Sequence, residues 1–179
     1  MTVEIRRRSA LERIRALVEQ LGAADPGFLT QIDVRCSPDD AVRVGFPTEP
    51  NTVTGDRDRQ TLWLGPDEWL VIAATDGVAE TVSDIEAALD GAHRSVVDVS
   101  ANRAVIELRS DDRLEMLASG CPLDLDPRGG WVAGRCAETV FAHAQVLLQE
   151  LDGATRVFVR PSFAQYVLER LLAARSVVA

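Results

Sequence analysis

Histidine and cysteine, the residue types that most often carry chemistry in proteins, are few and far apart in this chain. The histidines are His93 and His143, and the cysteines are Cys36, Cys121 and Cys136. A closed zinc site needs four nitrogen or sulfur ligands, which usually come in short pairs. The chain has no such pair, so the sequence predicts no metal site and three reduced cysteines.

Three aspartates stand in patterns that allow a chemical role. Asp98 interrupts the apolar run 96–99, and a partly desolvated carboxylate has a raised pKa that suits a general base. The alternative is that Asp98 caps the turn at residues 100–103. Asp124 and Asp126 alternate with leucines, so both face one side, where they could hold a metal or an amine, or accept hydrogen bonds from local amides.

Sequences that bind cofactors or mark common active sites are missing. The chain contains no GxGxxG, GxxxxGK[ST], HExxH or GxSxG. The first two are glycine-rich loops whose amides hold the phosphates of dinucleotides and nucleoside triphosphates. We therefore expect no catalytic, cofactor-binding or metal-binding residue in this chain.

Charge and hydropathy narrow the classes of partner. The 179 residues carry 28 acidic and 19 basic side chains, for a formal net charge of −9. An acidic body repels a phosphate backbone, so nucleic acid is not an expected partner. No apolar run reaches the roughly 18 residues of a membrane span, and the N-terminus lacks a signal-peptide pattern. We expect a cytoplasmic protein with no membrane partner.

The length predicts one domain over residues 1–179, because domains usually have roughly 100–200 residues. Two segments before residue 60 are unusual. Residues 1–28 form an N-terminal helical arm, whose helix begins with the capping box Ser9–Glu12 and ends at Gly22. The arginines at 6–8 are either a solvated tail or an arm that pairs with acids of another subunit. Residues 36–59, rich in proline and glycine, form an irregular connection with at most a short strand at 42–44.

After residue 59, strands come in adjacent runs with helices between the runs. Strands are predicted at 62–64, 69–72, 97–99 and 104–108, and two or three more over residues 137–148 and 155–159 together. Helices are predicted after caps at Asp76, Ser110 and Ser162. The order ββαββαβββα is typical of an α+β fold with mostly antiparallel sheet and a repeated ββα pattern.

Four segments in register carry a resemblance to a known family. They are LWLGPDEWLV (Leu62–Val71), SGCPLDLDP (Ser119–Pro127), GRCAETVFAHAQVLL (Gly134–Leu148) and PSFAQYVLERLL (Pro161–Leu172). In this order and spacing, the chain resembles the gamma subunit family of the heterotetrameric sarcosine oxidases. The resemblance is close from Leu62 to the C-terminus and loose over Leu29–Cys36.

The resemblance implies a fold similar to the folate-binding domain of the glycine-cleavage aminomethyltransferases. It also implies a non-catalytic accessory subunit, inactive alone, that assembles with alpha, beta and delta subunits. The family's complex demethylates sarcosine to glycine, with hydrogen peroxide and formaldehyde or methylene-tetrahydrofolate as further products. FAD, FMN, NAD, zinc and tetrahydrofolate are then expected in the partner subunits and none in this chain.

An accessory subunit must bury surface against a partner, and aromatic side chains are enriched in such contacts. Strand alternation places Trp63 and Phe158 outward, and the turn at 129–130 pushes Trp131 outward, so we expect all three at the interface. The alternative function is a freestanding folate-binding or aminomethyltransferase-like one-carbon protein. A pterin pocket faced by an acid such as Asp98 would distinguish it, because a shared fold does not confer function.

Overall fold

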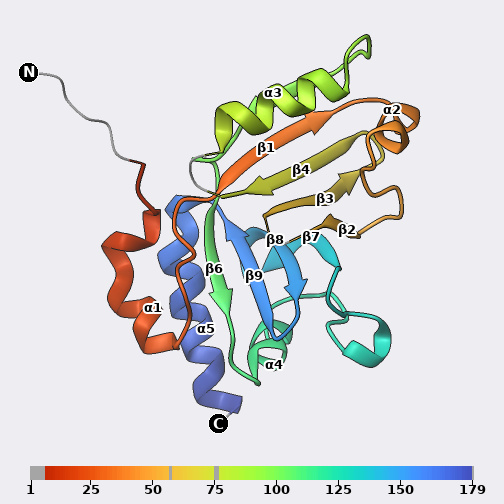
Figure 1. The fold of residues 1–179 in the computed structure, drawn as a ribbon. Coiled ribbons are helices and arrows are strands. Elements are labelled where there is room, and N and C mark those ends of the chain that lie inside the picture. The colour runs from red at the N-terminus through yellow and green to blue at the C-terminus, as the bar shows by residue number, and fades with distance from the viewer. Residues whose placement is uncertain (1–6, 57, 75–76, 179) are drawn as a thin grey trace, which may run out of the picture.

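The computed structural model describes residues 7–56, 58–74 and 77–178, which form two antiparallel sheets with helices on their outer faces (Figure 1). Helices α2 (Pro38–Arg43) and α3 (Val78–Ala88) cover the first sheet. Helices α1 (Arg15–Leu21), α4 (Arg113–Ala118) and α5 (Ala164–Val178) cover the second. The predicted α+β class with mostly antiparallel sheet is confirmed.

The first sheet has five strands in the order β2-β3-β4-β1-β5, and the second has four in the order β6-β9-β8-β7. All pairings are antiparallel. The strands of the first sheet are β1 (Thr30–Arg35), β2 (Val53–Gly55), β3 (Arg59–Gly65), β4 (Glu68–Ala73) and β5 (Ser95–Asp98). Those of the second are β6 (Ala104–Leu108), β7 (Cys136–Phe141), β8 (Ala144–Leu151) and β9 (Ala154–Val159).

The two halves of the chain repeat one topology. The succession β1-α2-β2-β3-β4-α3 gives the strand order β2-β3-β4-β1, and β6-α4-β7-β8-β9-α5 gives the matching order β7-β8-β9-β6. The segment leading into each half pairs with the other half. Strand β5 leads into β6 but pairs with β1, and Ala24 leads into β1 but bridges Glu107 on β6.

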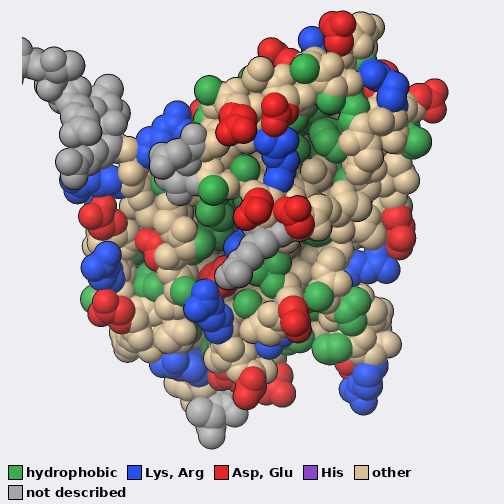
Figure 2. All heavy atoms as spheres, in the orientation of Figure 1, with side chains coloured by type: hydrophobic (Ala, Val, Ile, Leu, Met, Phe, Trp, Pro, Cys, Tyr) green, Lys and Arg blue, Asp and Glu red, His purple; other side chains and the backbone are tan. Residues whose placement is uncertain are grey.

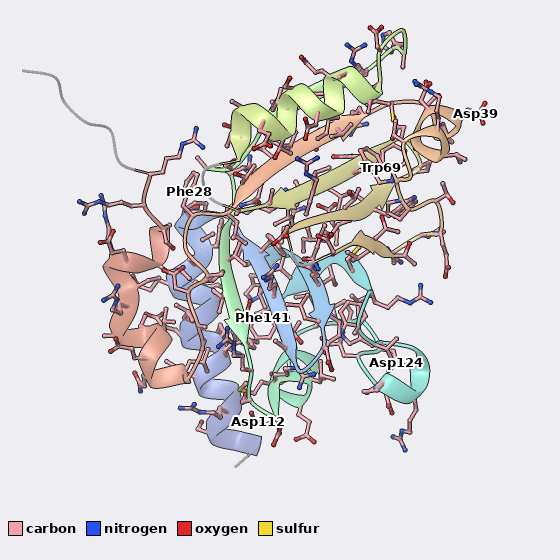
Figure 3. The ribbon with its side chains drawn as sticks, viewed as in Figure 1. Phe28, Asp39, Trp69, Asp112, Asp124 and Phe141 are labelled. Carbon is pink, nitrogen blue, oxygen red and sulfur yellow. The ribbon has the colours of Figure 1, made fainter. Side chains whose placement is uncertain are left out.

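Three apolar clusters follow from strand alternation, which sends successive side chains to opposite faces of a sheet. One lies between the first sheet and its helices, and contains Trp69, whose indole donates to the Pro47 carbonyl at 2.8 Å. One lies between the second sheet and its helices, and contains Phe141. Figure 3 shows these two aromatic side chains in separate halves. The third joins the two sheets and includes Leu70 and Phe158.

The N-terminal helical segment is confirmed in part. It starts as a 3-10 turn (Ala10–Ile14) capped by Ser9, whose hydroxyl oxygen accepts from the Leu11 amide, and α1 ends at Gly22 with a φ of 64°. The predicted reciprocal capping box does not form, because the Ser9 oxygen accepts from the Leu11 amide rather than from that of Glu12, and the Glu12 carboxylate pairs with Arg8.

The segment 36–59 contains more regular structure than expected. The strand predicted at 42–44 is wrong: Ser37 caps α2 by accepting from the Asp40 amide at 3.1 Å, and Pro38 stands in the first turn. Proline and a capping serine favour a helix start more strongly than two valines favour a strand. Strand β1 was not predicted. The helix cap predicted at Asp76 lies outside the described residues.

The remaining caps also differ from expectation. Helix α4 begins after Asp112 without a side-chain cap, and not at Ser110. Ser162 lies within a 3-10 turn (Pro161–Phe163) that leads into α5, so it does not cap that helix. The helices themselves are present where their apolar periodicity predicted them.

Candidate functional site

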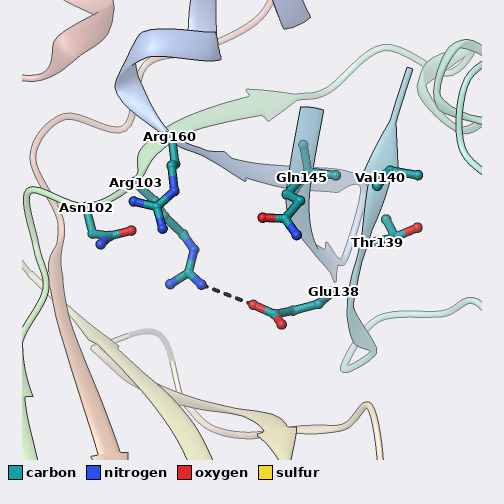
Figure 4. Close-up of a pocket in the computed structure, with 8 residues that line it drawn as sticks. Asn102, Arg103, Glu138, Thr139, Val140, Gln145 and Arg160 are labelled. Atoms are coloured by element: carbon teal, nitrogen blue, oxygen red, sulfur yellow. Dashed lines mark hydrogen bonds and ion pairs between the residues drawn. The ribbon is translucent and has the colours of Figure 1, made fainter. Parts of the chain in front are cut away.

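A cavity of about 440 Å³ opens at one end of the second sheet (Figure 4). Asn102 and Arg103 reach it from the turn between β5 and β6, Glu138 from β7, Gln145 from β8, and Arg160 from the residue after β9. One ion pair crosses part of it, since a guanidinium nitrogen of Arg103 lies 3.1 Å from a Glu138 carboxylate oxygen. The cavity therefore gathers charged and amide side chains from four separate segments.

Strand alternation explains how these side chains come together. Arg103, Gln145 and Arg160 each lie two residues from a buried apolar residue of the cluster between the sheets: Val105, Leu147 and Phe158. Residues two apart share a face of a strand. The cavity is thus a polar continuation of the inner face of the second sheet, beyond the point where the apolar cluster ends.

The opposite end of the same face is closed by a polar network. The Glu107 carboxylate accepts from Arg109 Nε at 2.8 Å and from Arg156 Nε at 3.0 Å. The side-chain oxygen of Gln60 accepts from Gln149 at 2.9 Å and from Arg156 at 3.3 Å. Burial works to raise the pKa of Glu107, but the hydrogen bonds from Arg109 and Arg156 outweigh it and hold that pKa below its ordinary value.

We expect Glu107→Gln to destabilise the chain in a pH-dependent way. A carboxylate whose pKa is lowered by folding adds stability above its unfolded pKa of about 4.3, and this contribution disappears as the pH falls through the folded value. The variant should lose about 2 kcal/mol at neutral pH, the scale of hydrogen bonds to charged groups. Urea denaturation from neutral to acidic pH measures the difference, which should shrink below about pH 4.3.

Glu138→Gln is the matched control, because the Glu138 side chain is 54% exposed and its ion pair with Arg103 is solvated. Exposed pairs contribute at most about 1 kcal/mol. If the two variants lost the same stability at every pH, the account of the buried network would be wrong.

Trp131 does not lie on the surface, so its predicted outward position is wrong. It is 8% exposed, and its indole nitrogen donates to the buried carboxylate of Glu150 at 3.1 Å. Arg113 donates to the other oxygen of that carboxylate at 2.7 Å, and Thr155 also donates to it. Turning the chain at 129–130 folds the indole back onto this network.

The outward position predicted for Phe158 is also wrong, because its side chain has no exposed surface. Alternation puts Phe158 on the inner face of the second sheet, where the first sheet covers it. Trp63 is half-buried and lies on the opposite face from Leu62, as alternation predicted, against the cluster under α2 and α3. Its contact with a partner stays a prediction.

Asp98 caps a turn, as one of the two readings expected. It accepts from the Ser100 amide at 3.0 Å and from the Ser100 hydroxyl. Burial works to raise the pKa of Asp98, but these hydrogen bonds outweigh it and hold the pKa below its ordinary value. Asp98 does not line the cavity. The prediction that Asp98 could act as a general base is therefore wrong, because it required a raised pKa and a position that faces a pocket.

Asp124 and Asp126 bind local groups. Asp124 accepts from the Asp126 amide at 3.0 Å, and Asp126 caps a 3-10 turn (Pro127–Gly129) and pairs with Arg128. Hydrogen bonds from Arg128 lower the pKa of Asp126. Within residues 7–56, 58–74 and 77–178, no group of three or more His, Cys, Asp or Glu side chains is placed to hold a metal.

The cysteines are buried and unpaired. Cys136, under the sheet-to-sheet contact, donates to backbone carbonyls of Thr52 and Trp63, and burial raises the pKa of its thiol to about 12. A thiol with so high a pKa is protonated at neutral pH and is a poor nucleophile or metal ligand.

Comparison with known proteins identifies the family of this chain. The sequence model described as "Sarcosine oxidase, gamma subunit family" matches residues 22–176. The chain belongs to this family. A sarcosine oxidase subunit gamma from Corynebacterium sp. (strain P-1) is 33% identical, over 95% of this chain and 90% of that protein. One from Arthrobacter sp. is 35% identical, over 79% of this chain and 76% of that protein.

Solved structures agree with the family. A chain of the heterotetrameric sarcosine oxidase from Corynebacterium sp. U-96, in complex with pyrrole 2-carboxylate, matches with a TM-score of 0.85 and 29% identity over 95% of both chains. The glycine cleavage system aminomethyltransferase T from Bartonella henselae matches with a TM-score of 0.62 and 10% identity, over 87% of this chain and 48% of that one. The second match shows the fold alone and confirms the predicted aminomethyltransferase-like fold.

The sequence reasoning missed the cavity residues. Their signal was present, because a polar residue stands two positions from a strand's apolar residue in each of three strands: Arg103 before Val105, Gln145 before Leu147, and Arg160 after Phe158. This spacing places each residue on one face of its strand, but only the order of the strands in the sheet brings the three residues together.

Proposed function

We propose that this chain is a non-catalytic accessory subunit of a heterotetrameric sarcosine oxidase. The observation that carries the proposal is the match over 95% of both chains to a chain of such a complex, at a TM-score of 0.85. A likeness that spans both chains supports the same place in an assembly, because the shapes available for contact are then alike along their whole length.

The proposed partners are the alpha, beta and delta subunits, with FAD, FMN, NAD, zinc and tetrahydrofolate held by those partners. The local geometry supports a role without chemistry of its own. The buried carboxylates of Glu107 and Glu150 are held by arginines, and the Cys136 thiol is protonated. No described helix is long and apolar enough to cross a membrane.

Few large apolar side chains are exposed among the described residues. The exposed apolar side chains are spread over different elements: Val42, Val97, Val132, Val140 and Phe163. Acidic and basic side chains are interspersed on the face in Figure 2. Specific contacts of half-buried residues such as Trp63, together with shape, are therefore proposed to hold the partner.

The alternative function, a freestanding folate-binding or aminomethyltransferase-like one-carbon protein, is not favoured by any observation on the described residues. Its distinguishing feature was an acid such as Asp98 facing a pocket, and Asp98 instead caps a turn. The 10% identity to the aminomethyltransferase carries the fold only.

Co-expression tests the proposed function. We expect the tagged chain to capture the other three subunits in a fixed ratio and to be colourless, with no sarcosine oxidation, when purified alone. Absorbance spectra and peroxide release measure these outcomes. An isolated chain that carries flavin in stoichiometric amount, or one that captures no subunit under conditions in which all four are folded, would contradict the proposal.

A further inference from the structure

The face of the second sheet that packs against the first has arginines at both of its ends. One end is filled by a polar network, and the other opens into the cavity. At the closed end, the Glu107 carboxylate receives hydrogen bonds from Arg109 and Arg156. At the open end, Arg103 and Arg160 both line the cavity. Each end thus presents a pair of guanidinium groups, and only the closed end holds a carboxylate bonded to both members of its pair.

The one described carboxylate that lines the open end, that of Glu138, is not bonded to both arginines as Glu107 is. Glu138 lies on the far wall of the cavity, is 54% exposed and is bonded to Arg103 (Figure 4). Among the described residues, the Arg160 guanidinium and the side-chain amides of Asn102 and Gln145 have no hydrogen-bond or ion-pair partner. Most of the described arginines are paired with carboxylates or backbone carbonyls; Arg160 is one of the few that are not, and of these it alone lines the cavity.

The unpaired groups converge on one volume. In Figure 4, the guanidinium groups of Arg103 and Arg160 lie near each other, with Asn102 beside them and Gln145 across the cavity. Val140, which is 42% exposed, adds an apolar wall. The volume of about 440 Å³ lies in the range of small-ligand pockets, roughly 300–1,000 Å³.

We propose that this cavity is a binding site for a small organic monocarboxylate. The carboxylate is held by the planar fork of the Arg160 guanidinium, which fits two carboxylate oxygens at once. The amides of Asn102 and Gln145 donate further hydrogen bonds, and a short apolar chain lies against Val140. One negative charge is favoured over several, since one guanidinium is unpaired and the chain carries a net charge of −9.

A ligand-observed NMR titration of the full chain with pentanoate tests the site, with the neutral isostere pentanamide in a parallel titration. We expect saturable binding of pentanoate and none of pentanamide. Arg160→Gln should weaken pentanoate binding at least tenfold, the scale of a lost charge-assisted pair. Arg170→Gln is the matched control, because Arg170 is also exposed but lies on α5 and does not line the cavity, and this variant should leave the affinity unchanged.

Other outcomes would overturn the proposal. These are no saturable binding of pentanoate, equal binding of pentanamide, or an affinity that Arg160→Gln leaves unchanged. Inorganic phosphate that competes more tightly than pentanoate would replace the carboxylate assignment with a phosphate site. If pentanoate does not bind but Arg160→Gln weakens capture by the other subunits, the cavity is a docking point for a partner. Thermal melts of both variants, expected to match the unsubstituted chain, separate these results from unfolding.

Discussion

Trp131→Ala is expected to lower the free energy of unfolding by about 3–5 kcal/mol, the range for removing a buried tryptophan. The substitution leaves a void between the loop at 127–135 and the second sheet, and it removes a donor from the buried carboxylate of Glu150. Urea denaturation followed by circular dichroism measures the loss. If Trp131 were an exposed interface residue, as the sequence suggested, the denaturation midpoint of the isolated chain would not move.

Trp131→Phe separates packing from hydrogen bonding. Phenylalanine retains most of the buried apolar volume but cannot donate to Glu150, so the loss should fall to about 1–3 kcal/mol. Equal losses for the two variants would mean that the hydrogen bond, rather than the packing, fixes the indole.

Phe158→Ala is expected to cost a similar 3–5 kcal/mol. The phenyl ring has no exposed surface and stands between the two sheets, beside Leu62 and Leu70 of the first. The cost arises from the contact that holds the sheets together, so denaturant should unfold the variant at a lower concentration in one transition. Tryptophan fluorescence and far-UV circular dichroism should report the same midpoint.

Phe163→Ala is the control for this substitution. The Phe163 side chain is 44% exposed in the turn before α5, so its removal should cost less than about 1 kcal/mol. A Phe158→Ala variant as stable as Phe163→Ala would disprove the packing of the two sheets described above.

The errors at Trp131 and Phe158 show where sequence patterns stop being informative. Alternation correctly assigns Phe158 to the face opposite Val157, but it cannot tell which faces are covered. Both faces of β9 are buried, one by helices and one by the first sheet. For Trp131, the decisive partner is Glu150, 19 residues later in the chain, and no local pattern predicts such a contact.

Local signals predicted most of the elements, and the errors among them have local causes. Apolar periodicity found α3, α4 and α5, and alternation found β3, β4 and β6. At 36–43, Ser37 and Pro38 form a helix-start signal that overrides the strand preference of the two valines at 42 and 44. Strand β1 was missed although the sequence carries a signal for it, because Ile32 and Val34 alternate with polar residues as in a half-buried strand.

The cavity was not predicted because its residues come from four segments whose proximity depends on the sheet order β6-β9-β8-β7. Each polar residue alone is ordinary at a strand end. Only the register, in which Val146 pairs with Val159 and Ala104 pairs with the same Val159, brings Arg103, Gln145 and Arg160 to one edge.

The segment before each half of the chain pairs with the other half, and this links the two halves mechanically. Because β5 belongs in sequence to the second half but completes the first sheet, and Ala24 joins the first half to β6, the two halves are interlocked. If the chain were divided between α3 and β5, the first sheet would lose its edge strand β5, and the second would lose the bridge between Ala24 and Glu107. We therefore expect that neither half folds independently, and that a partner bound to one half also restricts the motion of the other.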